Sequence, residues 1–143
     1  METESHLERF INAQQTDYFR ALTEIRNGRK ESHWMWYIFP QIRGLGFSET
    51  ARFYAIHDLK EAGDYLAHPV LGKRLIEISS ALLAIEGKTA HQILGSPDDL
   101  KLRSSMTLFS LLENTDPVFQ AVLDKFFNGL PDQRTVELAG ATK

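Results

Sequence analysis

Residues 70–87 read VLGKRLIEISSALLAIEG and carry the clearest secondary-structure signal in the chain. Apolar residues recur there at alternating intervals of four and three, at Leu71, Leu75, Ile78, Leu82 and Ile85. This spacing places the apolar side chains on one face of an α-helix. We therefore predict an amphipathic helix from Val70 to Glu86 that ends at Gly87.

Signals for helix starts occur on both sides of this segment. Ser5 and Glu8 have the spacing of a capping box, and Ser48 is expected to cap a short helix that carries Tyr54. A short helix is also expected at residues 90–94. Three further helices are expected to open at Ser96-Pro97, Asp116-Pro117 and Asp132.

The chain shows no pattern typical of β-structure. No stretch has the apolar–polar alternation of a half-buried strand, and no Asn-Gly pair marks a hairpin. We predict an all-α fold, a compact single domain of about seven to nine short helices that is not a symmetric bundle. The domain is expected to span residues 1–143, ordered from about residue 5 to 138, with a frayed tail at residues 139–143.

Composition is that of a globular protein, with 43% hydrophobic and 24% charged residues. The absence of cysteine excludes disulfides, metal–thiolate sites and thiol catalysis. The polar start METESHLERF shows no signal peptide. The longest apolar run, residues 34–39, is far shorter than the ~18–20 residues of a membrane-spanning helix. We therefore expect a cytoplasmic protein without membrane contact.

Charge and histidine spacing narrow the set of expected partners. The net charge is −3, and Lys and Arg are dispersed among acidic residues, so we do not expect nucleic-acid binding. The five histidines lack metal-ligand spacing, and we expect neither a metal nor another cofactor. Asp58, Glu61 and Asp64 form an acidic strip that we interpret as solvated rather than as an acid–base pair.

Residues 33–46, HWMWYIFPQIRGLG, are the strongest candidate for a functional segment. Their unbroken apolar run is typical of a buried central helix ended by Pro40. Trp and Tyr also carry polar groups that suit a pocket wall, and polar residues flank the run. The turn from Gly44 to Ser48 could expose backbone N–H groups to an anion, or simply join two helices. It matches neither a dinucleotide fingerprint nor a P-loop.

A second polar segment follows Ser96. Lys101 and Ser105 share one helix face, with Ser104 beside them, and a lysine that loses its proton could activate a serine. We favour a solvated polar strip, formed by these residues with Arg103 and Thr107, over catalysis. A role in ligand binding also remains open.

Four segments resemble the bacterial family catalogued as domain of unknown function 1810, whose members are sometimes labelled calpastatin. They are GRKESHWMWYIFPQIRGLGFS, HPVLGKRL, KLRSSMTLF and FFNGLPDQRT, within a match from about Phe10 to Thr135. The resemblance implies a mainly α-helical single domain and brings no established activity. It also implies that the blocks at residues 30–46 and 101–109 converge in one place.

We therefore hypothesise a pocket for a small anionic, ring-bearing ligand such as a nucleotide or ADP-ribose. Its expected walls are Trp34, Trp36 and Tyr54. Its expected polar contacts are Lys30, His33, Gln41, Arg43, Gly44, Gly46, Ser48, Lys101 and Ser105. A looser similarity to helical N-glycosidases of the NADAR type, through Asp132 and Thr135, implies glycosidic hydrolysis. The alternative is a non-catalytic protein-interaction module.

Overall fold

A computed structural model describes residues 2–140, with side chains from residue 7 onward. Within this range nine helices and no strand are present, which confirms the predicted all-α fold. The helices are α1 (Glu2–Arg26), α2 (Met35–Ile38), α3 (Glu49–Phe53), α4 (Leu59–Ala67), α5 (Leu71–Leu83), α6 (Ala90–Leu94), α7 (Asp98–Ser110), α8 (Val118–Phe127) and α9 (Gln133–Leu138).

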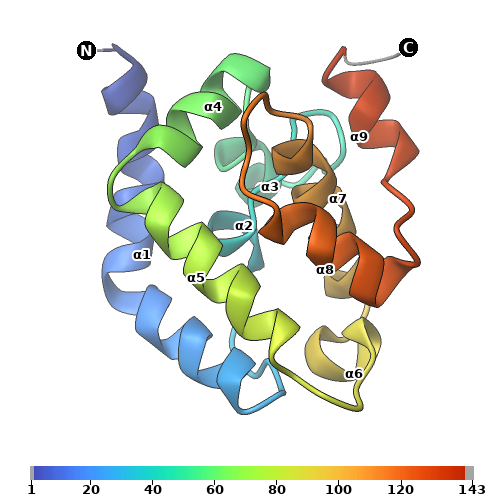
Figure 1. Cartoon of the computed structure of the whole chain (residues 1–143). Helices are drawn as coiled ribbons and strands as arrows, with labels where there is room; N and C mark the ends of the chain where they lie inside the picture. Colours follow the sequence, from blue (N-terminus) through green and yellow to red (C-terminus); the bar gives the residue numbers. More distant parts are fainter. Residues whose placement is uncertain (1, 141–143) are drawn as a thin grey trace.

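Helix α5 lies near the middle of the domain and packs against α1, α4 and α8, while α7 packs against α6, α8 and α9 (Figure 1). A row of buried aromatic rings ties four of these helices together. Phe10 is 5.1 Å from Tyr65, Tyr65 is 5.5 Å from Phe109, and Phe109 is 5.7 Å from Phe119, between ring centroids. Aromatic contacts therefore join α1, α4, α7 and α8 in one core.

The predicted helix at residues 70–86 is present as α5, with its four inner apolar residues Leu71, Leu75, Ile78 and Leu82 buried. It ends at Leu83, earlier than expected. The N–H groups of Ala84 and Ile85 bond to carbonyls three residues back, so the last turn tightens before Gly87.

Two of the predicted caps are confirmed. Ser48 Oγ accepts from Ala51 N at 3.1 Å, and Asp132 Oδ2 accepts from Thr135 N at 3.0 Å. The Ser5 cap is wrong because α1 already begins at Glu2. The Ser96 cap is also wrong: Pro97 precedes the first residue of α7, and no side chain caps that helix.

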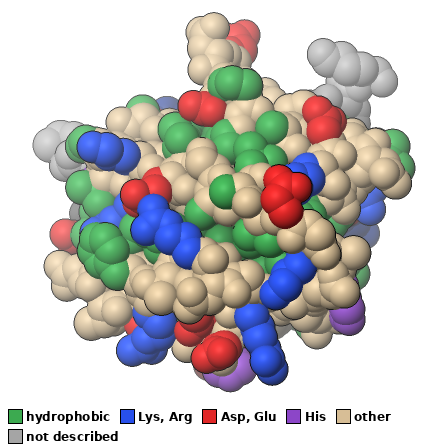
Figure 2. Space-filling model, turned by 60° about the horizontal axis from the view of Figure 1, so that its bottom comes forward, with side chains coloured by type: hydrophobic (Ala, Val, Ile, Leu, Met, Phe, Trp, Pro, Cys, Tyr) green, Lys and Arg blue, Asp and Glu red, His purple; other side chains and the backbone are tan. Residues whose placement is uncertain are grey.

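Two surface properties bear on the expected partners. Among residues 2–140, no helix is both long and apolar enough to cross a membrane. Figure 2 shows one face on which hydrophobic side chains are surrounded by separate basic and acidic side chains. On that face the positive charges do not form one continuous patch.

Of the expected tail, residues 141–143 lie outside the described part of the chain.

Candidate functional site

The aromatic run at residues 34–39 is partly core and partly surface. Trp34, Met35, Ile38 and Phe39 are buried, whereas Trp36 and its neighbour Tyr37 are half-buried. The expected central helix is wrong in its extent, because α2 has only four residues. Phe39 leaves the helical conformation, as expected for a residue directly before proline.

Trp34 belongs to the core rather than to a pocket. Its side chain is 1% exposed, and its indole N–H donates to Glu24 Oε1 at 2.9 Å. Glu24 Oε2 accepts from the Ser32 hydroxyl at 2.6 Å, and Oε1 also accepts from the N–H groups of Glu31 and Ser32. Burial alone would raise the pKa of Glu24, but these hydrogen bonds outweigh it and lower the pKa to about 2.

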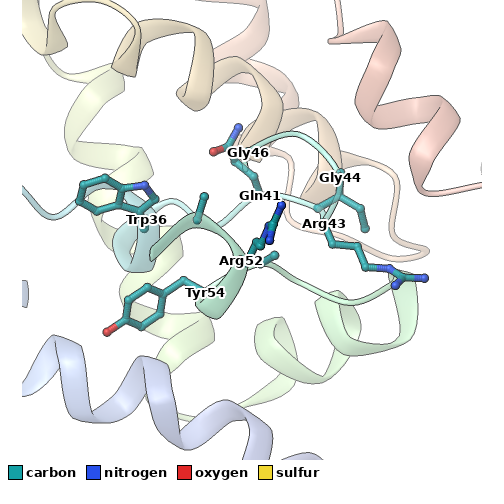
Figure 3. Close-up of a pocket in the computed structure, with 10 residues that line it drawn as sticks. Trp36, Gln41, Arg43, Gly44, Gly46, Arg52 and Tyr54 are labelled. Carbon is teal, nitrogen blue, oxygen red and sulfur yellow. The ribbon is translucent and has the colours of Figure 1, made fainter. Parts of the chain in front are cut away.

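A closed loop that begins after this run contains the candidate site. Ile56 N donates to Gln41 O at 2.8 Å, and Arg43 N donates to Ile56 O at 2.9 Å. These two bonds join the ends of the loop, and a cavity of about 230 Å³ lies inside it (Figure 3). The lining residues are Trp36, Gln41, Ile42, Arg43, Gly44, Gly46, Ala51, Arg52, Tyr54 and Ala55.

Two glycines are required where the loop turns around this cavity. Gly44 has a φ of +101°, and a Cβ there would lie 3.1 Å from the Leu138 side chain of α9. A Cβ on Gly46 would lie only 2.6 Å from the Cβ of Ala51. The turn at Gly46 can therefore approach α3 only because it carries no side chain.

Arg9 of α1 holds the wall formed by α3. Its guanidinium donates from Nε to Phe53 O and from Nη2 to Ala55 O, each at 2.8 Å. It also pairs with Glu61 at 3.4 Å, and Glu61 accepts from His57 N at 2.6 Å. The expected solvated strip therefore contains one buried structural carboxylate, because Glu61 is 7% exposed.

The cavity is electrostatically suited to an anion. Arg43 and Arg52 line it, and none of the described lining residues is acidic. Arg52 shares the lining with Gln41 and the glycine turn, whereas the Arg43 guanidinium extends away from Trp36 and Tyr54 (Figure 3). Arg52 is therefore the cation best placed to contact a ligand in the cavity.

Tyr54 forms an aromatic wall that remains a hydrogen-bond donor at neutral pH. Its ring lies 5.9 Å from Phe10 and 5.1 Å from Tyr37, between centroids. Burial raises the pKa of Tyr54, while Arg9 opposes this effect. Burial and the hydrogen bond to Asp17 likewise raise the pKa of Tyr37. Both phenols therefore stay neutral near pH 7.

Lys30 and Lys101 meet at one carboxylate beside the cavity. Lys30 Nζ lies 2.9 Å from Asp98 Oδ2, and Lys101 Nζ lies 3.5 Å from Asp98 Oδ1. Lys30 also lies over Trp34, and Lys101 over Trp36, at 5.1 and 4.9 Å from the ring centroids. The two predicted blocks are therefore brought together here by an ion-pair cluster.

The interpretation of residues 104–107 as a solvated strip is wrong. Ser104 is 6% exposed, and Ser105 and Thr107 are fully buried. Ser104 Oγ contacts Asp132 Oδ2 at 3.2 Å, and Thr107 Oγ1 accepts from Asp132 N at 2.8 Å. Asp132 is the N-cap of α9, so Ser104 and Thr107 fix the start of that helix. Among the described residues, Ser105 Oγ has no hydrogen-bond partner.

The structure divides the twelve predicted contact residues into two groups of six. The first group lines the cavity: Trp36, Gln41, Arg43, Gly44, Gly46 and Tyr54. The second group does not: Lys30, His33, Trp34, Ser48, Lys101 and Ser105. In the second group, His33 is exposed and Ser48 caps α3.

Sequence reasoning missed Arg52. Its only signal was its place in the helix predicted to carry Tyr54, two residues before that tyrosine.

The sequence matches the family described as protein of unknown function (DUF1810) over residues 4–139. The chain belongs to this family. A solved structure has the same fold: the crystal structure of the conserved hypothetical protein Rv1873 from Mycobacterium tuberculosis is 46% identical in sequence. The similarity covers 95% of this chain and 97% of that chain, with a TM-score of 0.92. None of the curated proteins compared with the chain matches it.

Proposed function

We propose that the cavity inside the loop at residues 41–56 binds a small anionic ligand that carries an aromatic ring. The observation that supports this proposal most is the composition of the lining. Two arginines and two aromatic side chains, Trp36 and Tyr54, share a cavity whose described lining contains no carboxylate. Guanidinium groups bind anions through paired N–H donors, and aromatic faces stack on ligand rings.

The side chains that face the cavity are available to a ligand. Within residues 2–140, the side chains of Gln41, Arg43 and Arg52 make no hydrogen bond or ion pair. An anion can therefore bind without first breaking an internal contact. The backbone of the walls is fixed by the bonds that Ile56 and Arg9 make, so the ordering cost of binding falls on the arginine side chains rather than on the loop.

A thermal-shift panel on the purified protein tests the proposal. The compounds are inorganic phosphate, nucleotides, NAD, ADP-ribose and flavin precursors. A ligand that binds only the native state stabilises it by about 2.7 kcal/mol at a hundredfold excess over Kd. We expect at least one ring-bearing anion to raise the melting temperature, and Arg52→Ala to remove most of that rise.

Arg29→Ala is the matched control, because Arg29 is exposed and lies outside the cavity lining. It should retain the full shift. No shift with any compound, or a shift that Arg52→Ala leaves unchanged, would overturn the proposal. Incubation of any binding nucleoside ligand, followed by chromatography for released base, tests the further possibility of N-glycosidic hydrolysis.

A protein-interaction module is the second candidate function, and one observation favours it. Phe47 and Phe53, both on the cavity loop, are 71% and 59% exposed. Exposed aromatic side chains are common at protein interfaces. If no compound shifts the melting temperature, concentration-dependent association in sedimentation experiments, lost in Phe53→Ser, would support this alternative.

A further inference from the structure

A second hollow adjoins the proposed ligand cavity and differs from it in character. Its lining includes four aromatic residues, Trp36, Tyr37, Phe53 and Tyr54. Phe53 is the most exposed of these, and its ring lies 4.8 Å from that of Tyr54, between centroids, in an edge-to-face arrangement. Such a surface offers several ring faces and edges to a planar group.

The cavity and the hollow meet at three residues. Trp36, Arg52 and Tyr54 line both of them. The remaining cavity lining supplies the polar groups of Gln41, Arg43 and the glycine turn. The remaining lining of the hollow supplies the rings of Tyr37 and Phe53 together with Glu49 and Thr50. A ligand held at Arg52 can therefore place an anionic end on one side and a ring on the other.

The size of the cavity limits which anionic group can enter it. Its volume of about 230 Å³ is below the roughly 300–1,000 Å³ of typical ligand pockets. A terminal phosphate needs space only for itself. The pyrophosphate of NAD or ADP-ribose carries a substituent at each end, and both substituents would have to leave the cavity. The small volume therefore favours a terminal group.

We infer, on the basis of the proposed function, that the ligand is a phosphate monoester that carries an aromatic base, of the nucleoside monophosphate class. Its phosphate lies in the cavity against Arg52. Its ring lies in the hollow against Trp36 and Phe53. Charge-assisted hydrogen bonds to the phosphate and stacking of the ring then make separate contributions to affinity.

Calorimetric titration with four probes tests this inference: AMP, adenosine, ADP-ribose and inorganic phosphate. The variants are Arg52→Gln, Phe53→Ala and the control Arg29→Gln. We expect the wild-type protein to bind AMP about tenfold to a hundredfold more tightly than adenosine, and also more tightly than ADP-ribose. Arg52→Gln should reduce the AMP-to-adenosine ratio to near one, and Arg29→Gln should leave it unchanged.

The variant Phe53→Ala tests the contribution of the ligand's ring to affinity separately from that of its phosphate. It should weaken AMP and adenosine binding by the same factor, about fivefold or more, and leave phosphate binding unchanged. Tighter binding of ADP-ribose than of AMP would overturn the inference but leave the proposed anion site standing. A Phe53→Ala protein that binds AMP normally would also overturn it. If none of the four probes binds, this inference and the proposed nucleotide-like ligand are both wrong.

Discussion

Lys101 lies over the indole ring of Trp36, with its Nζ 4.9 Å from the ring centroid. The same ammonium group is 3.5 Å from Asp98, whose other carboxylate oxygen is 2.9 Å from Lys30 Nζ. One carboxylate thus connects the first turn of α7 to the segment that precedes α2. Because Trp36 lines the cavity, this cluster sets the position of one of its walls.

Replacing the shared carboxylate should destabilise the fold. In Asp98→Asn, the buried Lys30 side chain, which is 7% exposed, would lose its carboxylate partner. We expect a loss of about 2–4 kcal/mol in the free energy of unfolding, measured with urea. Asp64→Asn is the control: its partner Lys60 is 77% exposed, and the loss should stay below about 0.5 kcal/mol. Equal losses in the two variants would contradict this role for Asp98.

Removal of the Arg9 side chain should loosen the α3 wall. Arg9→Ala loses the bonds to Phe53 O and Ala55 O and leaves the buried Glu61 without this partner. We expect a loss of about 2–4 kcal/mol and faster hydrogen exchange of the Ile56 amide. Arg9→Lys should recover only part of the loss, because an ammonium cannot reproduce the guanidinium fork. Unchanged exchange at Ile56 would show that Arg9 does not hold the loop.

Glu24 should make stability depend on acid pH. Its pKa is about 2 in the folded protein against an ordinary value of 4.5, so its contribution is complete above about pH 4.5. As the pH falls from 4.5 towards 2, the unfolded chain takes up a proton that the native protein does not. This difference removes up to about 3 kcal/mol of stability.

The variant Glu24→Gln cannot lose this contribution, so its stability should fall less steeply than that of the wild-type protein between pH 4.5 and 2. Urea unfolding at several pH values measures both slopes. Glu137→Gln, at an exposed position on α9, should leave the slope unaltered. Parallel profiles for wild type and Glu24→Gln would contradict the low pKa.

A side chain at Gly46 should distort the cavity. Gly46→Ala places a Cβ 2.6 Å from that of Ala51, which forces the turn and α3 apart. We expect a loss of about 1–3 kcal/mol and weaker binding of any cavity ligand. The double variant Gly46→Ala/Ala51→Gly removes the clash, so the two changes should show a coupling energy of about 1 kcal/mol. Simple additivity would show that no close contact exists.

Helix positions followed from local signals in the sequence. The caps at Ser48 and Asp132 depend on residues three positions apart, and the core face of α5 depends on spacing along one helix. Such interactions are specified by neighbours in the chain. The all-α fold could therefore be predicted without knowledge of which helices touch.

The site was only partly predictable because its decisive contacts are long-range. The sequence placed Trp36 and Tyr54 in a pocket, but it did not show that Trp34 would turn inward to bond Glu24. Ser104 and Thr107 of α7 contact Asp132, the N-cap of α9, and residues 25 or more positions apart give no sign of this contact in the sequence. Arg52 was missed because only the closure between residues 42 and 56 brings α3 to the cavity.

The central claim is that the loop cavity binds an anionic, ring-bearing ligand, and amide chemical-shift mapping tests it most directly. AMP is titrated into the ¹⁵N-labelled protein while backbone amides and the two indole N–H signals are followed. We expect the shifts to concentrate at residues 41–55 and at the indole of Trp36, and to require much higher AMP concentrations in Arg52→Ala. Shifts centred elsewhere, or no shifts at millimolar AMP, would contradict the account.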